Sequence, residues 1–163
     1  MPKVYLLLGG NLGDRTSYLS QARDRIAAQV GPIVRSSALY ETAAWGKTDQ
    51  PAFLNQVVEV WAEHTPEYVL FMINQIEQEL GRVREEHWGA RVIDIDILFY
   101  DDLALQTSRL TIPHPQLHLR RFTLLPLAEL APELMHPVLG KSIVALLEEC
   151  PDELDVRHFT PAQ

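Results

Sequence analysis

The stretch Val4-Tyr5-Leu6-Leu7-Leu8-Gly9-Gly10-Asn11-Leu12-Gly13-Asp14 predicts a strand, a tight turn and the start of a helix in direct succession. The five apolar residues at its beginning are typical of a buried strand. Asp14 can cap a helix, which we expect to run to about Val30 and to end at Gly31-Pro32. The chain therefore begins with a β-α unit.

Strands and helices continue to alternate after this unit. We expect strands over residues 33–40, 53–63 and 92–100, and a helix from Thr65-Pro66 to Gly81. That helix has proline at its first position and apolar side chains at a period of 3.6 residues. The order β-α-β-β-α-β predicts an α+β fold, a ferredoxin-like sandwich in which helices pack on an antiparallel sheet.

Extra elements are expected at the C-terminus. The sequence predicts a turn at Asp101-Asp102, a short strand near Leu110, a proline-rich loop, and helices near 124–130 and 142–149. No repeat, low-complexity tract or Gly/Ser linker interrupts the 163 residues. We therefore expect a single domain over residues 1–163.

The composition narrows the classes of partner. A formal net charge of −8 disfavours nucleic-acid binding, which needs a basic excess. Arginines nevertheless concentrate between Arg82 and Arg121, which favours a small polyanionic ligand. No apolar run approaches the roughly 20 residues that span a bilayer. The single cysteine, Cys150, fits a reducing compartment, so we expect a cytoplasmic protein that is not bound to a membrane.

A pair of aspartates carries the strongest chemical signal. In the strand around Asp94 and Asp96, side chains alternate, so Ile93, Ile95, Ile97 and Phe99 are expected to point into the core. The two carboxylates then share the other face, about 6.6 Å apart along the strand. Alternating aspartates are also ordinary on the wet face of a sheet. At this spacing, however, they can flank two divalent ions that hold phosphoryl oxygens, and oxygen ligands favour Mg²⁺.

Several arginines favour a metal and phosphate site over an ordinary solvent-exposed sheet face. Arg82 and Arg84 follow the helix end at Gly81, where one cation would simply complement the helix dipole. A second arginine on the same segment favours a phosphate clamp, since guanidinium groups bind phosphate in a bidentate manner. The other arginines that support it are Arg91, Arg109, Arg120 and Arg121.

Three other sequence patterns indicate a functional site less strongly than the aspartates and arginines do. The glycines at 9, 10 and 13 lack the Gly-Lys-Ser/Thr of a phosphate-binding loop, so a strand-to-helix turn is favoured. His114 and His118 have a zinc-like spacing, but Pro115 disfavours a continuous helix and no third ligand is evident. His114 fits better as a hydrogen-bond donor to phosphate. The aromatic residues between Tyr40 and Asn55 could serve either as satellite core or as a ligand platform.

Taken together, the motifs resemble the family of 6-hydroxymethyl-7,8-dihydropterin pyrophosphokinase. The run His87 to Leu98 looks like the signature of that family, and the resemblance extends over nearly the whole chain. Further matching segments, in order, are Leu8 to Asp14, Asp49-Gln50-Pro51 with Phe53-Leu54-Asn55, Ile76-Glu77 with Gly81-Arg82-Val83-Arg84, Pro113-His114-Pro115, and Arg120-Arg121-Phe122 with Pro126-Leu127.

The resemblance implies transfer of pyrophosphate from ATP to the hydroxyl of the pterin, with AMP as the second product, in folate biosynthesis. It implies two Mg²⁺ ions on Asp94 and Asp96, and catalytic roles for these carboxylates with Arg82 and Arg91. The nucleotide side would comprise Asn74, Glu77, Arg82, Arg84, Arg91, Ile97, Arg109, Thr111, His114 and Arg120. The pterin pocket would comprise Thr42, Ala43, Trp45, Phe53, Asn55, Trp88 and Phe122.

This sequence departs from the pattern of the family at three places. Asn74 stands where glutamine is more frequent, Ala43-Ala44 lacks a proline, and Glu85 adds a negative charge beside Arg84. A competing hypothesis is a ferredoxin-like regulatory domain that binds nucleotide without turnover. The paired carboxylates favour the enzyme, and RNA binding on the sheet is disfavoured by the charge. We expect a monomer.

Overall fold

The computed structural model describes residues 1–43, 51–81 and 92–160. The elements are β1 (Lys3–Gly10), α1 (Arg15–Gln29), β2 (Ile33–Ser36), β3 (Leu39–Thr42), β4 (Phe53–Trp61), α2 (Pro66–Glu79), β5 (Asp94–Tyr100), β6 (Leu105–Gln106), β7 (Thr111–Ile112), the 3-10 helix η1 (Leu117–Leu119), α3 (Arg121–Leu130), α4 (Ile143–Glu149) and β8 (Val156–Phe159). Within these ranges, no helix is both long and apolar enough to cross a membrane.

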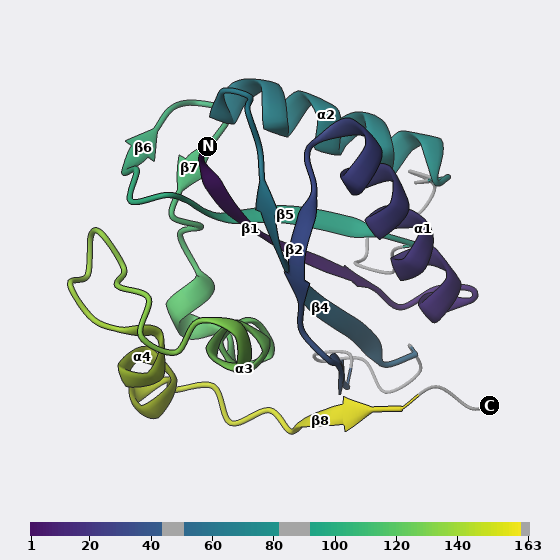
Figure 1. Cartoon of the computed structure of the whole chain (residues 1–163). Coiled ribbons are helices and arrows are strands. Elements are labelled where there is room, and N and C mark those ends of the chain that lie inside the picture. The colour runs from purple at the N-terminus through teal and green to yellow at the C-terminus, as the bar shows by residue number, and fades with distance from the viewer. Residues whose placement is uncertain (44–50, 82–91, 161–163) are drawn as a thin grey trace.

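A central antiparallel sheet carries helices on both faces (Figure 1). The strand order is β5-β1-β4-β3-β8, and β2 also pairs with β4. The expected β-α-β-β-α-β order is confirmed when β2 and β3 are counted as one interrupted strand. Helices α1 and α2 cover one face, and α3 and α4 cover the other, so the C-terminal elements add a third layer.

The helix ends lie where their capping residues predict. The Asp14 carboxylate accepts a hydrogen bond from the N–H of Ser17, and the Thr65 hydroxyl accepts one from Tyr68. Gly81 follows α2 with a φ of +89°, a left-handed conformation that glycine adopts without steric cost. Helix α1 packs on β1 and β4, and α2 packs on α1 and β5.

The expected strand over residues 33–40 is in fact two strands. Ser37 breaks it, because its N–H donates to the Val57 carbonyl at 2.8 Å while its hydroxyl accepts from the Val57 N–H at 3.0 Å. The register moves by one residue between the pairs Ser36–Val58 and Tyr40–Asn55. A side-chain hydroxyl thus replaces a backbone group in the ladder, which the apolar pattern could not indicate.

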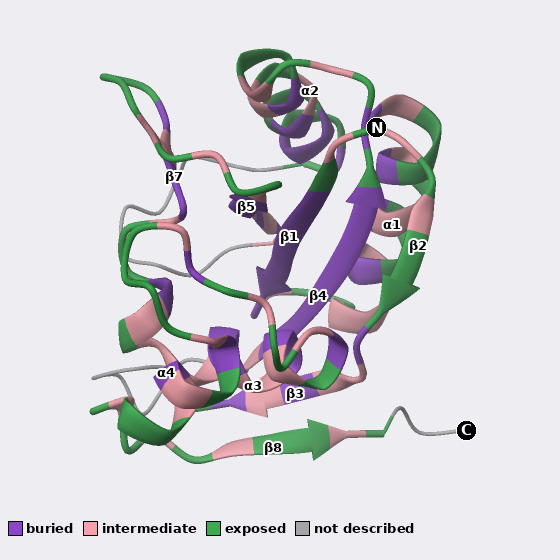
Figure 2. Cartoon of the chain, turned by 60° about the vertical axis from the view of Figure 1, so that its left-hand side comes forward, coloured by how far each residue is buried: buried purple, intermediate pink, exposed green. Residues whose placement is uncertain are grey.

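Two hydrophobic cores lie on opposite faces of the sheet. Leu6, Leu8 and Ile95 belong to the core under α1 and α2, while Tyr5 and Leu7 belong to the core under α3 and α4. Figure 2 shows β1 and β4 buried along most of their length between these layers. Both faces of the central strands are therefore dry except where a cavity opens.

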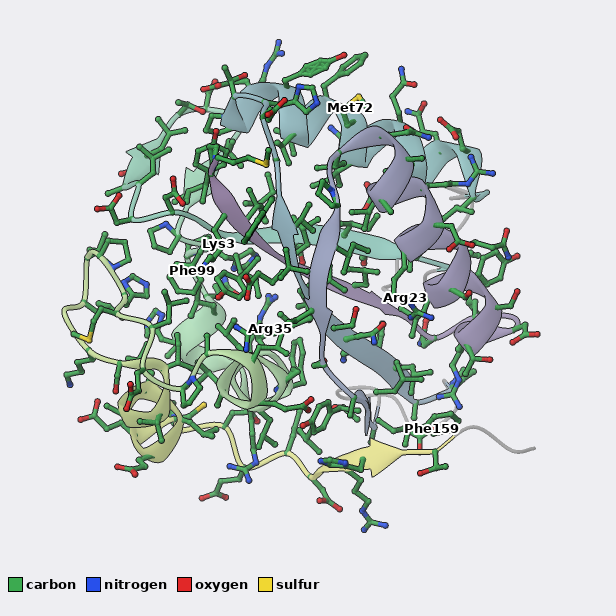
Figure 3. All side chains as sticks on the ribbon, in the orientation of Figure 1. Lys3, Arg23, Arg35, Met72, Phe99 and Phe159 are labelled. Carbon is green, nitrogen blue, oxygen red and sulfur yellow. The ribbon has the colours of Figure 1, made fainter. Side chains whose placement is uncertain are left out.

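The expectation that Phe99 points into the same core as Ile93, Ile95 and Ile97 was wrong. Phe99 packs in the core under α3, and Figure 3 shows it on that side of the sheet. The cause is a bulge: Leu6 pairs with Ile97 and Tyr5 with Phe99, so Leu98 has no partner residue. An extra residue reverses the alternation, and Leu98 and Phe99 face the same core.

Sequence reasoning missed the last strand. β8 pairs antiparallel with β3 at the edge of the sheet, with Leu39 opposite Phe159 and Thr42 opposite Val156. Both views place β8 alongside this edge, beyond α3 (Figures 1 and 2). The C-terminal segment therefore returns from α4 to the strand that carries Thr42.

Candidate active site

The floor of the site is a row of residues across three strands. Asn55 on β4 lies opposite Gly9 on β1, which lies opposite Asp94 on β5. Asp96 is opposite Leu7 in the neighbouring row. Strands are about 4.8 Å apart, so Asn55 and Asp94 lie about 10 Å from each other across the glycine. The side chains of this face point toward α3.

A cavity of about 700 Å³ opens over this floor, and we call it the main cavity. Its lining comes from the central strands, the η1–α3 segment and the C-terminal segment. The lining residues are Leu7, Gly9, Thr42, Ala43, Phe53, Asn55, Asp94, Asp96, Gln116, Leu119, Arg120, Phe122, Pro151, Asp152 and Leu154. Eight residues predicted from the sequence are thus brought together: Thr42, Ala43, Phe53, Asn55, Asp94, Asp96, Arg120 and Phe122.

Gly9 gives Asn55 the space for its side chain. A Cβ atom built on Gly9 would lie 2.2 Å from the Asn55 Oδ1 atom, far inside van der Waals contact. Asn55 is itself only 5% exposed. The glycine therefore serves close packing in the floor, in agreement with the preference against a phosphate-binding loop.

The wall formed by β3 and β4 is held by polar contacts with the N-terminal turn. The Asn11 amide donates to the Pro51 carbonyl, and the Arg15 guanidinium bonds both Glu41 and the Ala52 carbonyl. The Thr42 hydroxyl in this wall is buried and has no hydrogen-bond partner within the described ranges. A buried unpaired hydroxyl costs about 1–3 kcal/mol, which a polar ligand can offset.

Aromatic and cationic groups form the opposite wall. Phe122 is half-buried in the first turn of α3, and the guanidinium carbon of Arg120 lies 5.7 Å from its ring centroid. Arg120 also donates to the Gln116 side chain at 2.7 Å. With Phe53 across the cavity, this wall offers apolar area for a flat ring and one fixed positive charge.

The carboxylates of Asp94 and Asp96 are half-buried at the cavity floor. The described part of the chain holds no group of three or more histidine, cysteine or acidic residues that could bind a metal by themselves. Two carboxylates nevertheless fit Mg²⁺, which binds one or two of them and fills its remaining positions with water and substrate phosphates. The donor set suits a metal that arrives with a polyphosphate.

His114 interacts electrostatically with Asp96 and lines a second cavity of about 390 Å³, which Thr111 also lines. The backbone N–H of His114 donates to the carbonyl of the bulged Leu98 at 3.0 Å, so the β5 bulge holds the loop in place. Burial lowers the pKa of His114; the charge of Asp96 acts in the opposite direction, and Arg120 lowers the pKa further. His114 therefore favours its neutral form.

The other residues predicted for the nucleotide side do not line the main cavity. Asn74 is exposed on α2, and Arg109 is exposed before β7. Glu77 is buried and accepts a hydrogen bond from the Ile95 N–H at 2.8 Å, while Ile97 packs in the core under α2. Outside the described residues lie the predictions for Trp45, Arg82, Arg84, Trp88 and Arg91, and the departures at Ala44 and Glu85.

Sequence reasoning missed several lining residues. Gln116 and Leu119 lie just beyond the Pro113-His114-Pro115 motif, which offered a signal by proximity. Pro151, Asp152 and Leu154 have no such signal, because no motif surrounds them and β8 was not expected. The pairing of β8 with β3 and the hydrogen bond from the Arg121 N–H to Asp152 bring them to the cavity.

Comparison with known proteins gives consistent matches. The sequence model of the 7,8-dihydro-6-hydroxymethylpterin-pyrophosphokinase family matches residues 5–132. A 2-amino-4-hydroxy-6-hydroxymethyldihydropteridine pyrophosphokinase of Methylorubrum extorquens is 46% identical over 136 residues, which is 83% of this chain and 86% of that protein. One of the same name from Aquifex aeolicus is 41% identical over 143 residues, covering 88% and 89%.

Solved structures show the same fold. The HPPK-DHPS of Plasmodium falciparum superposes with a TM-score of 0.71 at 22% identity, over 91% of this chain. This chain spans 43% of that longer one. At this identity the likeness concerns the arrangement of strands and helices.

Proposed function

Because the chain belongs to the 7,8-dihydro-6-hydroxymethylpterin-pyrophosphokinase family, we propose that the main cavity is its catalytic site, with the pterin and the reacting phosphates side by side on the floor. The enzyme transfers pyrophosphate from ATP to the hydroxyl of 6-hydroxymethyl-7,8-dihydropterin in folate biosynthesis. ATP is the co-substrate. The row Asn55–Gly9–Asp94 is the observation that supports this placement of the two substrates. It sets an amide that can bind the heterocycle at a fixed distance from a carboxylate on the phosphate side.

Asn55 binds the polar edge of the pteridine ring. This edge alternates donors and acceptors, and an asparagine side chain offers one of each. The buried Thr42 hydroxyl, which has no hydrogen-bond partner within the described ranges, supports a second polar contact with the ring. Phe53 and Phe122 cover the flat faces of the ring, which contributes binding without discriminating between heterocycles. Specificity therefore comes from the buried polar groups, where a mismatch costs most.

Asp94 and Asp96 would hold two Mg²⁺ ions beside the phosphates. When bound, the ions supply positive charge that neutralises the triphosphate oxygens. Arg120 adds a fixed cation at the wall, and His114 beside Asp96 donates a hydrogen bond to a phosphate oxygen. These groups align the ATP β-phosphorus for attack by the pterin hydroxyl in line with the departing AMP. Arg82 and Arg91 stabilise the charge that shifts during transfer.

We also propose that residues 1–163 act as one pyrophosphokinase domain, as a monomer in the cytoplasm. The cavity is built within one chain from β1, β3, β4, β5, α3 and the C-terminal segment, so its described lining needs no second copy.

Product analysis tests the proposal. Enzyme, ATP and Mg²⁺ are incubated with and without the hydroxymethyl dihydropterin, and nucleotides are separated by anion-exchange chromatography. We expect AMP only when both pterin and Mg²⁺ are present. ADP as the product, or AMP independent of pterin, would contradict pyrophosphate transfer. The Asn55→Ala variant serves as the site control, since it should raise the pterin KM and leave the ATP affinity nearly unchanged.

A further inference from the structure

The C-terminal segment lies outside the family match yet forms a wall of the main cavity. The match ends at residue 132, whereas Pro151, Asp152 and Leu154 line the cavity. From residue 151 to residue 157 exposure alternates, and Asp152, Leu154 and Val156 are the more buried residues of this stretch. The alternation directs one face of an extended chain toward the site. We call residues 151–159 the strap.

Asp152 ties the strap to the aromatic wall. One carboxylate oxygen accepts the N–H of Arg121, the first residue of α3, at 3.0 Å, and the other accepts the N–H of Leu154 at 3.0 Å. The residue before α3, Arg120, makes no side-chain cap of its own. Asp152 therefore caps α3 from a distant part of the sequence, one residue before Phe122.

The other end of the strap is tied to the opposite wall. Val156 pairs with Thr42 in the β8–β3 ladder. Further along, the His158 ring packs on Tyr40 with centroids 4.6 Å apart, and the guanidinium carbon of Arg15 lies 5.2 Å from the Phe159 ring centroid. The strap thus spans the gap between the α3 wall and the β3 wall.

We propose that the strap sets the separation of the two walls that enclose the pterin, with Asp152 as a positioning residue and Leu154 as a contact residue. This inference rests on the proposed placement of the pterin in the main cavity. Capping by Asp152 fixes the first turn of α3, and with it the Phe122 ring. Arg120 is held separately by Gln116, so the phosphate side depends less on the strap.

Steady-state kinetics of Asp152→Ala test this proposal. Losing a helix cap from a wall that must hold the ring should raise the pterin KM roughly 3- to 30-fold. The kcat and the Kd of a non-hydrolysable ATP analogue should stay within about threefold. Asp152→Asn keeps one acceptor oxygen and should give an intermediate KM. Glu149→Ala is the matched control, because this carboxylate is exposed and pairs with Lys141.

Leu154→Ala provides a second measurement that does not depend on the cap. The backbone N–H that bonds Asp152 remains, and only a half-buried side chain at the cavity is shortened. We expect roughly a 2- to 10-fold rise in pterin KM, with the melting temperature close to that of wild type.

Three outcomes would overturn the inference. An unchanged pterin KM in both Asp152→Ala and Leu154→Ala, with a raised KM in Asn55→Ala, removes the strap from the site and leaves the proposed function intact. If Asp152→Ala weakens the binding of the pterin and of the ATP analogue equally, and Asp152→Asn does not restore the pterin KM, Asp152 is a purely structural residue. An unchanged KM in all variants including Asn55→Ala overturns the pterin placement and the strap together.

Discussion

Replacing Gly9 by alanine should impair pterin binding through Asn55. The added Cβ would lie 2.2 Å from the Asn55 Oδ1 atom, and ordinary contacts begin at 3.4 Å, so the amide must move by about 1 Å. A hydrogen bond stretched by that amount is largely lost. At about 1–3 kcal/mol for each unmatched group, the pterin KM should rise roughly 5- to 150-fold.

A double-mutant cycle measures this mechanism directly. If Gly9 acts only by making room for Asn55, adding Gly9→Ala to the Asn55→Ala variant should raise the pterin KM less than about threefold above that of Asn55→Ala alone. The assay is AMP formation at varied pterin and saturating ATP, with an ATP analogue titrated separately. Gly140→Ala is the stability control, because Gly140 has a φ of +67° but, apart from its chain neighbours, no atom of the described residues lies within 4 Å of the position that an added methyl group would take.

Two results would contradict the proposed role of Gly9. The first is a double variant whose loss equals the product of the single losses, since independent effects would mean that Gly9 and Asn55 do not interact. The second is a pterin KM within twofold of wild type in Gly9→Ala. A comparable rise in Gly140→Ala would instead attribute the effect to general destabilisation.

Other groups give independent predictions. Asp94→Ala or Asp96→Ala should lower kcat about 10²- to 10⁴-fold with little loss of melting temperature, and turnover within tenfold of wild type at saturating Mg²⁺ would exclude a metal role. Arg82→Ala and Arg91→Ala should reduce kcat more than ATP affinity; loss of affinity alone would make them simple anchors. Burial, with a smaller contribution from the His118 charge, lowers the pKa of His136. The unfolded chain then binds the proton more readily, so stability should fall as pH drops below about 6.5 through the lower folded pKa. Thermal melts between pH 5 and 8 should show a smaller fall for His136→Asn, and an equal fall would contradict this.

Local signals predicted most of the fold. Asp14, Thr65-Pro66 and Gly81 fixed the ends of two helices, and the alternation of strand and helix predicted their order. The carboxylate pair could be placed on one face because Asp94 and Asp96 precede the bulge at Leu98, where alternation still holds. Beyond it, the same rule failed for Phe99.

The parts that could not be predicted depend on contacts distant in sequence. The break at Ser37 depends on a hydroxyl that bonds Val57, 20 residues away. Asp152 caps a helix that begins 31 residues earlier in the chain. Neither contact leaves a periodic pattern or a motif, so propensity and spacing carry no information about them. The role of Gly9 likewise appears only once Asn55 is seen opposite it.

The row across the floor has a consequence for which analogues the enzyme can accept. The separation of Asn55 and Asp94 is set by two inter-strand spacings, and backbone hydrogen bonds make that distance much stiffer than a loop would. An analogue with a small substituent at the edge of the ring would contact side chains that can change their conformation. A longer arm between ring and hydroxyl, such as hydroxyethyl in place of hydroxymethyl, would carry the attacking oxygen past the phosphate. With the pterin and phosphates placed as proposed, the sheet limits the length of the substrate, and we expect that substituting wall residues alone does not widen the tolerance for that length.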